Sequence, residues 1–518
     1  MHRQHPDFIS VFNDVLGPVM RGPSSSHTAG SHRIGLISRD LLGEAPAEAV
    51  FTFGENRSYA QVYKEQGVDC ALAAGLMGWD LTDERFSKSL DHAHQNGIKL
   101  VFKTGVLKDT HPNAVNIRLR SQNRVTLDLK AKSIGGGAVR FTSLNRWPVD
   151  LDGKAYVLFC ECQKQNQHRI LDLFDSQSHM EVDSFSKQGK SLLCLKTNSP
   201  FEKKQMRELH SLLNPGKVWS CSPVFFTRRG KELFLNGAEM LESARKNGKS
   251  LGQLALDYES RLLGFSLSET LEEMSRRQQV MWDSVAAGLQ NQNCQMKLLN
   301  PSAENIMKKE AGKNLLVGGV HLRAAARAMA VMHVTNSGGV VCAAPTGGSA
   351  GVLPGVALTL EQDLNGDEKT VKKGLFAAGA VGLAIARRAT FAAEEAGCQA
   401  EIGAAGAMAA AMVVESAGGS ARQALDAASI SLQNTMGSVC DLVQGLCEIP
   451  CHTRNAVAAS NAFLCADLIM GGYENPVSFD DTVDALYSVG KMLPQELRCT
   501  SKGGIATAPS ARSIPKKR

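Results

Sequence analysis

Three cysteines in the C-terminal part of the chain are the residues best suited to chemistry. Cys398, Cys440 and Cys451 lie in stretches rich in Ala, Gly and Met with few charges, and Cys447 lies between the last two. Grouped thiolates in an apolar, reduced setting are typical ligands of an iron–sulfur cluster or another soft metal. Buried cysteines also act as small hydrophobic residues, and metal sites more often use tight C-x2-C pairs. Spacing alone therefore leaves both interpretations open.

A polar loop near the N-terminus is the second candidate. Residues 22–30 read Gly-Pro-Ser-Ser-Ser-His-Thr-Ala-Gly and precede a periodic segment over residues 31–42. Small hydroxyl residues before such a segment predict a helix N-terminus, whose free N–H groups and positive dipole end attract an anion. A plain capping turn needs fewer polar residues than this loop contains, so we favour an anion-binding loop.

The composition predicts a globular protein of about two to four domains, because 518 residues exceed one core. Hydrophobic residues make up 43% and charged residues 21%, and the net charge of +6 comes without a long Lys/Arg run, so nothing indicates nucleic-acid binding. The chain has thirteen cysteines, and its first residues lack the apolar core of a secretory signal peptide. Reduced thiols in the cytoplasm are therefore favoured over disulfides. The apolar stretch 374–418 carries too many charges for a membrane span: Arg387, Arg388, Glu394, Glu395 and Glu401.

The expected elements change in kind along the chain. Up to about residue 140, strand-like runs alternate with helices, and a small mixture of strands and helices follows up to about residue 226. From about residue 233, helices dominate, and many are rich in Ala and Gly. We expect an α+β N-terminal part followed by a large all-α C-terminal domain. Expected strands include 50–53, 99–103 and 114–119, and expected helices include 8–16, 59–77, 81–96, 251–263, 266–289, 404–416 and 420–433.

Several short motifs are spread over nearly the whole chain. They are SSSHTAG at 24–30, HPN at 111–113, SIGGG at 133–137, APTGGSAGVLPG at 344–355, Cys440-Asp441, IPC at 449–451 followed by Arg454-Asn455, ELR at 496–498 and GGIA at 503–506. Each motif alone is weak, but the combination is specific. It resembles the iron–sulfur-dependent L-serine ammonia-lyases, also called L-serine dehydratases.

The resemblance implies three domains. Residues 1–145 would form a mixed α/β domain like the family's β portion, 146–235 a small ACT-like α+β module, and 236–518 an all-helical, cluster-binding catalytic domain like its α portion. It also implies a cytoplasmic homodimer that acts in amino-acid catabolism and gluconeogenesis, with a small amino acid as substrate and with no nucleic-acid or membrane partner.

The resemblance further implies a [4Fe–4S] cluster on Cys398, Cys440 and Cys451, with one iron left open to act as a Lewis acid on the serine hydroxyl. The site would lie in a pocket between the two main domains. The catalytic candidates are His27, Ser25 and Thr28. The substrate-binding candidates are Ser24, Ser26, Asn336, Thr346 and Arg454.

The sequence departs from the family pattern in three places. Gln66 stands where the family usually has a histidine, which is a natural candidate for the base, and glutamine cannot accept the proton. Leu442 replaces the proline that usually follows Cys-Asp. Cys447 and Cys499 are additional cysteines, and Cys447 is near enough in sequence to compete for the fourth iron.

Three functions remain open. The motif set favours a cluster-dependent serine ammonia-lyase. A lyase for another β-substituted amino acid, such as cysteine or a larger hydroxy acid, is the second. The third is a non-catalytic, amino-acid-binding regulatory protein that kept the pocket but lost its base. A pyridoxal phosphate enzyme is disfavoured, because no lysine lies in a convincing setting for that cofactor.

Overall fold

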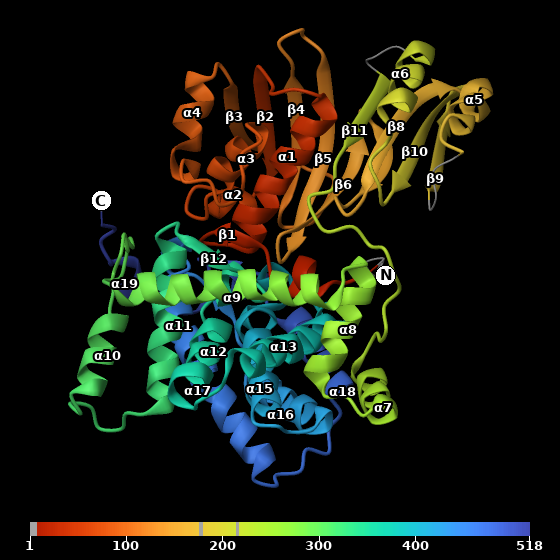
Figure 1. Ribbon diagram of the computed structural model, residues 1–518. Helices are drawn as coiled ribbons and strands as arrows, with labels where there is room; N and C mark the ends of the chain where they lie inside the picture. The colour runs from red at the N-terminus through yellow and green to blue at the C-terminus, as the bar shows by residue number, and fades with distance from the viewer. Residues whose placement is uncertain (1–7, 176–179, 214–216, 518) are drawn as a thin grey trace.

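The computed structural model describes residues 8–175, 180–213 and 217–517. Two sheets with their helices form one end of the molecule, and a large helical body forms the other (Figure 1). The chain is therefore mixed α/β with a large helical C-terminal region, as the pattern of elements predicts. No helix among these residues is long and apolar enough to cross a membrane.

The first sheet has six strands in the order β3-β2-β4-β5-β6-β7. Strands β2 and β3 are parallel, and the other neighbours are antiparallel. Because β7 is the sixth strand, this sheet continues past residue 145, and the division into domains stays a prediction. The strands are β2 (Glu48–Gly54), β3 (Lys99–Gly105), β4 (Ala114–Arg120), β5 (Thr126–Gly135), β6 (Ala138–Leu144) and β7 (Trp147–Leu151); the helices are α1 (Gly30–Leu42), α2 (Ser58–Val62), α3 (Val68–Leu76) and α4 (Ser89–Gln95).

The second sheet is antiparallel, with the strand order β11-β8-β10-β9. One of its faces packs against its own helices through residues such as Leu158 and Leu193. Its other face shares a core with α1 and the first sheet through Phe159 and Trp219. The two sheets therefore stabilise each other. The elements are β8 (Tyr156–Gln163), α5 (Gln167–Asp172), β9 (Glu181–Lys187), β10 (Lys190–Thr197), α6 (Lys203–Leu212) and β11 (Val218–Cys221).

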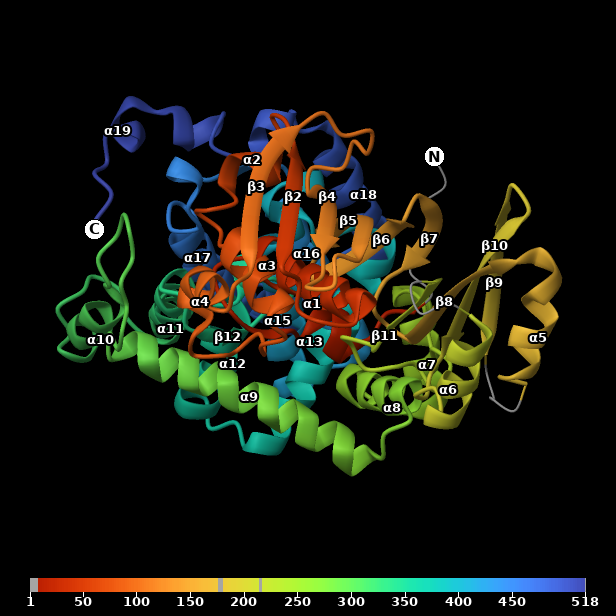
Figure 2. The same cartoon turned by 90° about the horizontal axis from the view of Figure 1, so that it is seen from above.

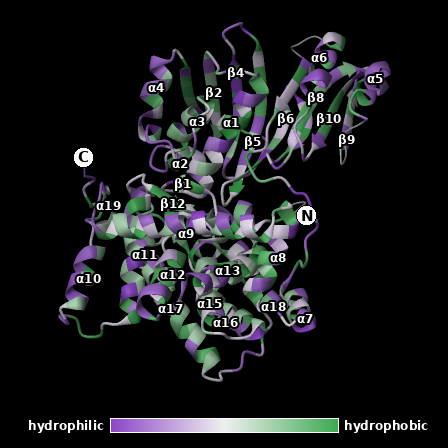
Figure 3. Ribbon diagram, viewed as in Figure 1, coloured by the Kyte–Doolittle hydropathy of each residue, from purple (hydrophilic) through white to green (hydrophobic). Residues whose placement is uncertain are grey.

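The helical body is built around α15, which is buried from Ile402 to Glu415. Its Ala- and Gly-rich sequence lets α13, α16 and α17 pack closely around it. Helices at the edge of the body, such as α10, carry hydrophilic residues, which are purple in Figure 3. The long α9 crosses one side of the body (Figure 2). The helices are α7 (Gly237–Asn247), α8 (Leu251–Leu263), α9 (Leu267–Leu289), α10 (Ala303–Ala311), α11 (Val320–Asn336), α12 (Val352–Asp363), α13 (Glu368–Arg388), α14 (Ala393–Ala396), α15 (Ile402–Ser416), α16 (Ala421–Gln433), α17 (Cys451–Met470), α18 (Phe479–Met492) and α19 (Pro509–Arg512).

Three predicted helices are wrong in extent, whereas those at 251–263, 266–289, 404–416 and 420–433 are confirmed within a few residues. The segment 59–77 is interrupted before Gly67, which has a φ of 66° and starts α3 as a new helix. In 81–96, Asp80 accepts hydrogen bonds from the backbone and hydroxyl of Thr82, so a local turn replaces the first helical turns. The segment 8–16 forms a single π-type turn, Val11–Val15.

Glu259 of α8 anchors that N-terminal turn. The backbone N–H groups of Val11 and Phe12 and the hydroxyl of Ser10 all donate to its buried carboxylate, at 2.8, 2.9 and 2.5 Å. The chain then runs through β1 (Val19–Arg21), which pairs with β12 (Val340–Cys342) of the helical body. These contacts place the loop at residues 24–30 against the helical body.

Glu259 predicts a pH-dependent stability. Burial raises the pKa of its carboxyl from 4.5 to about 7. The folded protein therefore holds a proton that the unfolded chain releases, and this stabilisation is lost as the pH rises from about 4.5 through 7. The shift corresponds to a loss of about 3 kcal/mol. Relative to Glu259→Gln, the wild-type midpoint of thermal unfolding should fall over this range, as followed by circular dichroism. Parallel pH curves for the two proteins would contradict the assignment.

Candidate active site between the serine loop and the cysteines

Five cysteines line one small cavity between the helical body and the loop at residues 24–30, here called the serine loop. The cavity volume is about 10 Å³, which is enough for one water molecule. The structure therefore brings Cys398, Cys440 and Cys451 together, as the sequence predicts, and adds both extra cysteines to them. The lining residues are Ser24, Ser26, Gln66, Gly348, Cys398, Glu401, Ile402, Cys440, Leu442, Cys447, Cys451 and Cys499.

Separate segments of the chain bring Cys398, Cys440, Cys451 and Cys499 to one place. Cys398 begins a short 3-10 turn just before α15, and Cys451 is the first residue of α17. Cys440 lies in β13 (Cys440–Asp441), which pairs in parallel with β14 (Arg498–Thr500). That pairing places Cys499 beside Cys440, although the two are far apart in sequence.

The donor set suits a thiolate-bound metal group. In the described part of the chain, no three His, Cys, Asp or Glu side chains are arranged so that they could hold a metal ion as they stand. However, burial and the neighbouring Cys440 raise the pKa of the Cys398 thiol well above its usual value. Buried thiols of this kind ionise when a cation binds them, so metal binding and thiol ionisation are coupled. Five converging thiols therefore fit a metal cluster by their chemistry.

The serine loop has the expected form of a helix start. Ser24 caps a π-type turn, Ser25–Ala29, by accepting a hydrogen bond from the backbone N–H of His27 at 3.2 Å, and α1 follows directly. His27 is fully buried, with its Nε2 3.0 Å from Ser58 Oγ and its Nδ1 3.2 Å from Ser24 Oγ. Ser24 and Ser26 line the cysteine cavity, whereas the predicted catalytic residues His27, Ser25 and Thr28 are not part of its lining.

The remaining polar residues of the loop differ in their contacts. Thr28 Oγ1 donates to the backbone oxygen of Gln66 at 3.0 Å, so this hydroxyl holds the loop against the turn before α3. Within the described residues, Ser25 Oγ and Gln66 Oε1 are buried without a hydrogen-bond partner. Gln66 lines the cysteine cavity, so its Oε1 is available to a polar ligand there, whereas Ser25 does not line the cavity. Gln66 thus lies at the site, at the position where the resemblance expected a base.

The other three predicted substrate residues lie around the cavity but do not line it. Thr346 is buried, with its Oγ1 3.0 Å from Ser349 Oγ. Asn336 donates to the backbone oxygen of Cys447 at 2.8 Å and so helps to hold the segment that carries Cys447 in place. Arg454 donates to the backbone oxygen of Val439 at 2.7 Å and lies 3.0 Å from Asp441. Their roles toward substrate stay predictions.

Two carboxyls at the site, Glu394, which is buried, and Glu401, which is only partly exposed, were not singled out by sequence reasoning. Glu401 lines the cysteine cavity, and burial together with Glu394 raises its pKa to about 8. Glu394 accepts a hydrogen bond from Asn113 Nδ2 at 2.8 Å and lies 3.6 Å from His27 Nδ1. The sequence signal for both residues is that charged side chains interrupt the otherwise apolar stretch 374–418, a pattern that also excludes a membrane span.

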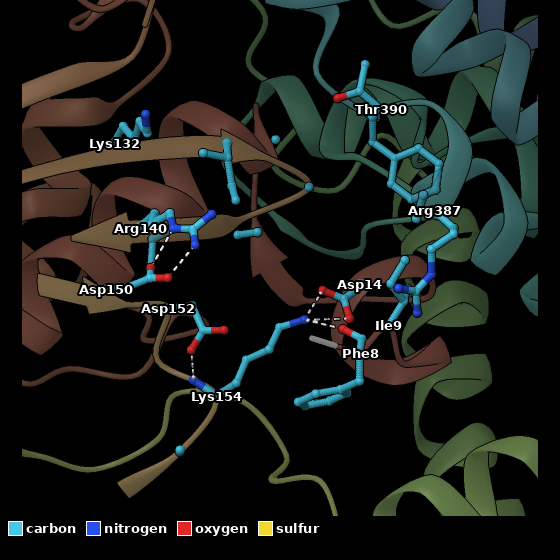
Figure 4. A pocket seen from close by; sticks show the side chains of 18 of the residues that line it. Phe8, Ile9, Asp14, Lys132, Arg140, Asp150, Asp152, Lys154, Arg387 and Thr390 are labelled. Carbon is cyan, nitrogen blue, oxygen red and sulfur yellow. Dashed lines mark hydrogen bonds and ion pairs between the residues drawn. The ribbon is translucent and has the colours of Figure 1, made fainter. Parts of the chain in front are cut away.

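A much larger cavity, of about 570 Å³, lies elsewhere, where the two sheets meet the end of α13 (Figure 4). In it, Lys154 Nζ lies 2.9 Å from Asp14, and Arg140 pairs with Asp150. No cysteine and no serine-loop residue lines this cavity. The smaller cavity is therefore the better candidate for chemistry.

Comparisons with known proteins agree with this geometry. The sequence model of the family described as "Serine dehydratase alpha chain" matches residues 195–506. The "Probable L-serine dehydratase, alpha chain" of Bacillus subtilis is 35% identical over 285 residues, covering 55% of this chain and 95% of the relative. The "L-serine dehydratase, alpha chain" of Peptoniphilus asaccharolyticus is 36% identical, covering 53% and 95%.

A second set of residues matches the other chain of the two-chain relatives. The "Probable L-serine dehydratase, beta chain" of Bacillus subtilis is 41% identical over 144 residues, covering 28% of this chain and 64% of the relative. One polypeptide is thus similar to both the alpha and the beta chain. The motifs, the converging cysteines and these matches lead to one conclusion: this chain belongs to the L-serine dehydratase family.

Proposed function

We propose that the protein is an L-serine ammonia-lyase, which converts L-serine to pyruvate and ammonia. The observation that carries the proposal is the meeting of the cysteines with the serine loop in one buried cavity. Such a site combines metal-binding thiols with polar atoms that have no partner in the described residues. The names of the relatives support serine as the substrate.

Cys398, Cys440 and Cys451 are the proposed ligands of a [4Fe–4S] cluster. Each comes from a different segment, and all three line the cavity. When bound, the cluster supplies a Lewis-acidic iron that makes the serine hydroxyl a better leaving group. Cys447 and Cys499 line the same cavity, so the chain holds more thiols than three-cysteine ligation needs.

The serine loop is the proposed site for the substrate carboxylate. The N-terminal end of the turn that leads into α1 favours an anion through its N–H groups. Ser24, Ser25 and Ser26 provide hydroxyls there, and that of Ser25 has no partner among the described residues. Thr28 holds the loop in place through Gln66. Thr346, Asn336 and Arg454 would support the opposite side of the cavity from outside its lining.

His27 is the proposed base. Burial lowers the pKa of its imidazole, so the ring is neutral and able to accept a proton at neutral pH. The Cα–H bond of serine breaks, the proton passes to the imidazole, and the electron pair forms the Cα=Cβ double bond. The Cβ–O bond breaks with its electron pair, and the proton held by the imidazole passes to the leaving hydroxide, which departs as water and returns His27 to its neutral form. The aminoacrylate then tautomerises and hydrolyses to pyruvate and ammonia.

The finer organisation is also proposed. The βαββαβ order of the second sheet supports an ACT-like module with a role in control. A cytoplasmic homodimer is part of the same proposal. Exposed Val457, Leu464 and Leu468 on α17 provide one apolar surface for a second copy. Sedimentation of the purified protein tests the dimer.

One observation favours a second candidate function. Gln66 lies buried at the site and cannot accept a proton, which is what a non-catalytic, amino-acid-binding relative would show. A lyase for another β-substituted amino acid remains the alternative within the same chemistry. Turnover assays with serine and with cysteine separate these three functions.

The cysteine assignment predicts which thiols hold iron. Replacing Cys398, Cys440 or Cys451 by Ala should each abolish the iron–sulfur absorption of anaerobically reconstituted protein, because each removes a thiolate ligand. Cys342→Ala and Cys465→Ala are matched controls, since both residues are buried outside the cavity. Iron content per chain is the measurement. Full iron in any of the first three variants would show the ligand set to be wrong.

The base assignment predicts a kinetic effect. His27→Ala should lower pyruvate formation by about 10²–10⁴-fold, the usual worth of a positioned base, while the cluster spectrum and serine binding remain. Gln66→His should raise the rate or leave it unchanged. Pyruvate from Gln66→His but none from the wild type would instead favour the regulatory function.

A further inference from the structure

We propose that Glu394 is a positioning residue of the deamination: it orients the buried imidazole of His27 so that Nε2 keeps the lone pair that accepts the α-proton. This inference rests on the proposed function and assigns a role to a residue outside the recognised motifs. It also addresses how the site works with glutamine at position 66.

Glu394 joins the two main parts of the molecule at the site. It lies in the short α14 of the helical body, yet both of its side-chain contacts are to the N-terminal part. Its Oε1 accepts a hydrogen bond from Asn113 Nδ2 at 2.8 Å and lies 3.6 Å from His27 Nδ1. The side chains of Glu394 and His27 are each only 1% exposed. Solvent therefore screens the field of Glu394 at the imidazole little.

The contacts of His27 select one tautomer. A carboxylate can only accept, so Glu394 favours a proton on Nδ1. Ser24 Oγ, 3.2 Å from the same nitrogen, already accepts from the backbone N–H of His27 and presents a lone pair as well. With the proton on Nδ1, Nε2 becomes an acceptor, and the Ser58 hydroxyl at 3.0 Å becomes its donor. Nε2 is thus the basic nitrogen.

The charge balance supports the same role. Burial lowers the pKa of His27, and Glu394 acts in the opposite direction. When Nε2 takes the α-proton, the imidazolium is paired with this carboxylate. The other ionisable groups close to the pair include Tyr59, whose pKa burial raises, and Cys499, whose pKa is also raised. A third is Glu401, whose pKa of about 8 keeps it protonated at neutral pH. Glu394 therefore provides the negative charge that His27 faces.

The second oxygen of Glu394 is not used by the fold. Oε2 is buried and has no hydrogen-bond partner in the described chain, and the same holds for Asn113 Oδ1 and Ser133 Oγ. These residues are neighbours, because the backbone N–H of Ser133 donates to the backbone oxygen of Asn113 at 3.3 Å. Unpaired buried polar atoms are costly, so a polar ligand in this place would satisfy them. A purely structural role would account for only one oxygen of Glu394.

The test is Glu394→Gln in the full, cluster-loaded chain. Glutamine keeps the size and an acceptor for Asn113 but removes the charge. We expect kcat to fall about 10–100-fold, as for other residues that orient a functional histidine, while KM changes less. Because His27 loses its anion, its pKa should fall, and the acidic limb of the kcat/KM profile should move to lower pH. Iron content should stay at the wild-type value.

Glu415→Gln is the matched control, since Glu415 is also buried and pairs with Lys373, at 3.3 Å, away from the site. It should keep the wild-type pH profile. An unchanged pH profile in Glu394→Gln, with a rate loss that only follows loss of folded protein, would overturn the positioning role.

An experiment independent of turnover separates this inference from the proposed function. In protein with ¹⁵N-labelled histidine, the His27 signals, assigned with His27→Asn, should show the proton on Nδ1 in the wild type and a lower pKa in Glu394→Gln. A proton on Nε2 in the wild type overturns the inference even if serine is consumed. Absence of pyruvate from iron-loaded wild type refutes the proposed function, and the tautomer still decides the role of Glu394.

Discussion

The burial of many ionisable groups at one junction is the constraint on which the rest of the structure depends. Five thiols, the carboxyl of Glu394 and the imidazole of His27 are buried here, and the carboxyl of Glu401 beside them is only partly exposed. In such surroundings a charge needs a partner, a bound cation or a change of protonation. Glu394 has Asn113 and His27, Glu401 is held protonated at neutral pH, and the Cys398 thiol stays protonated until a cation binds. Charge neutralisation is therefore built into the folded site.

This junction requires close approach of backbone segments from the two parts. A Cβ atom on Gly347 would lie 2.9 Å from the backbone oxygen of Pro23 and 3.0 Å from the backbone nitrogen of Ser25, so only glycine fits against the serine loop. On the other side, Asn455 donates to the backbone oxygen of Gly348 at 2.9 Å and to that of Cys451 at 2.9 Å. The loop that contains Gly347 and Gly348 is thereby held between the serine loop and the start of α17.

The second sheet has a different relation to the site. It shares a core with α1, the helix that follows the serine loop, through Phe159 and Trp219. Strand β1, which precedes the serine loop, is paired with β12 of the helical body. A change in the second sheet can thus reach the serine loop through α1, whereas the cysteines stand on the helical body. The segment proposed for control and the segment proposed for metal binding thus lie in separate parts of the molecule.

The amino-acid sequence by itself determined the local features of this protein. Ser24 indicates a helix start, because its hydroxyl can accept a hydrogen bond from a nearby backbone N–H. The periodic pattern over 251–289 predicts two helices, because apolar residues at helical spacing lie on one face. The proposed metal ligands stand out in the sequence as a set of cysteines in apolar surroundings. Only the tertiary structure decided the partners. The pairing of β13 with β14 puts Cys499 beside Cys440, and packing of the two parts puts Glu394 against Asn113, 281 positions earlier in the chain. Contacts of that kind depend on how whole elements pack against one another, so they cannot be predicted from a local sequence pattern.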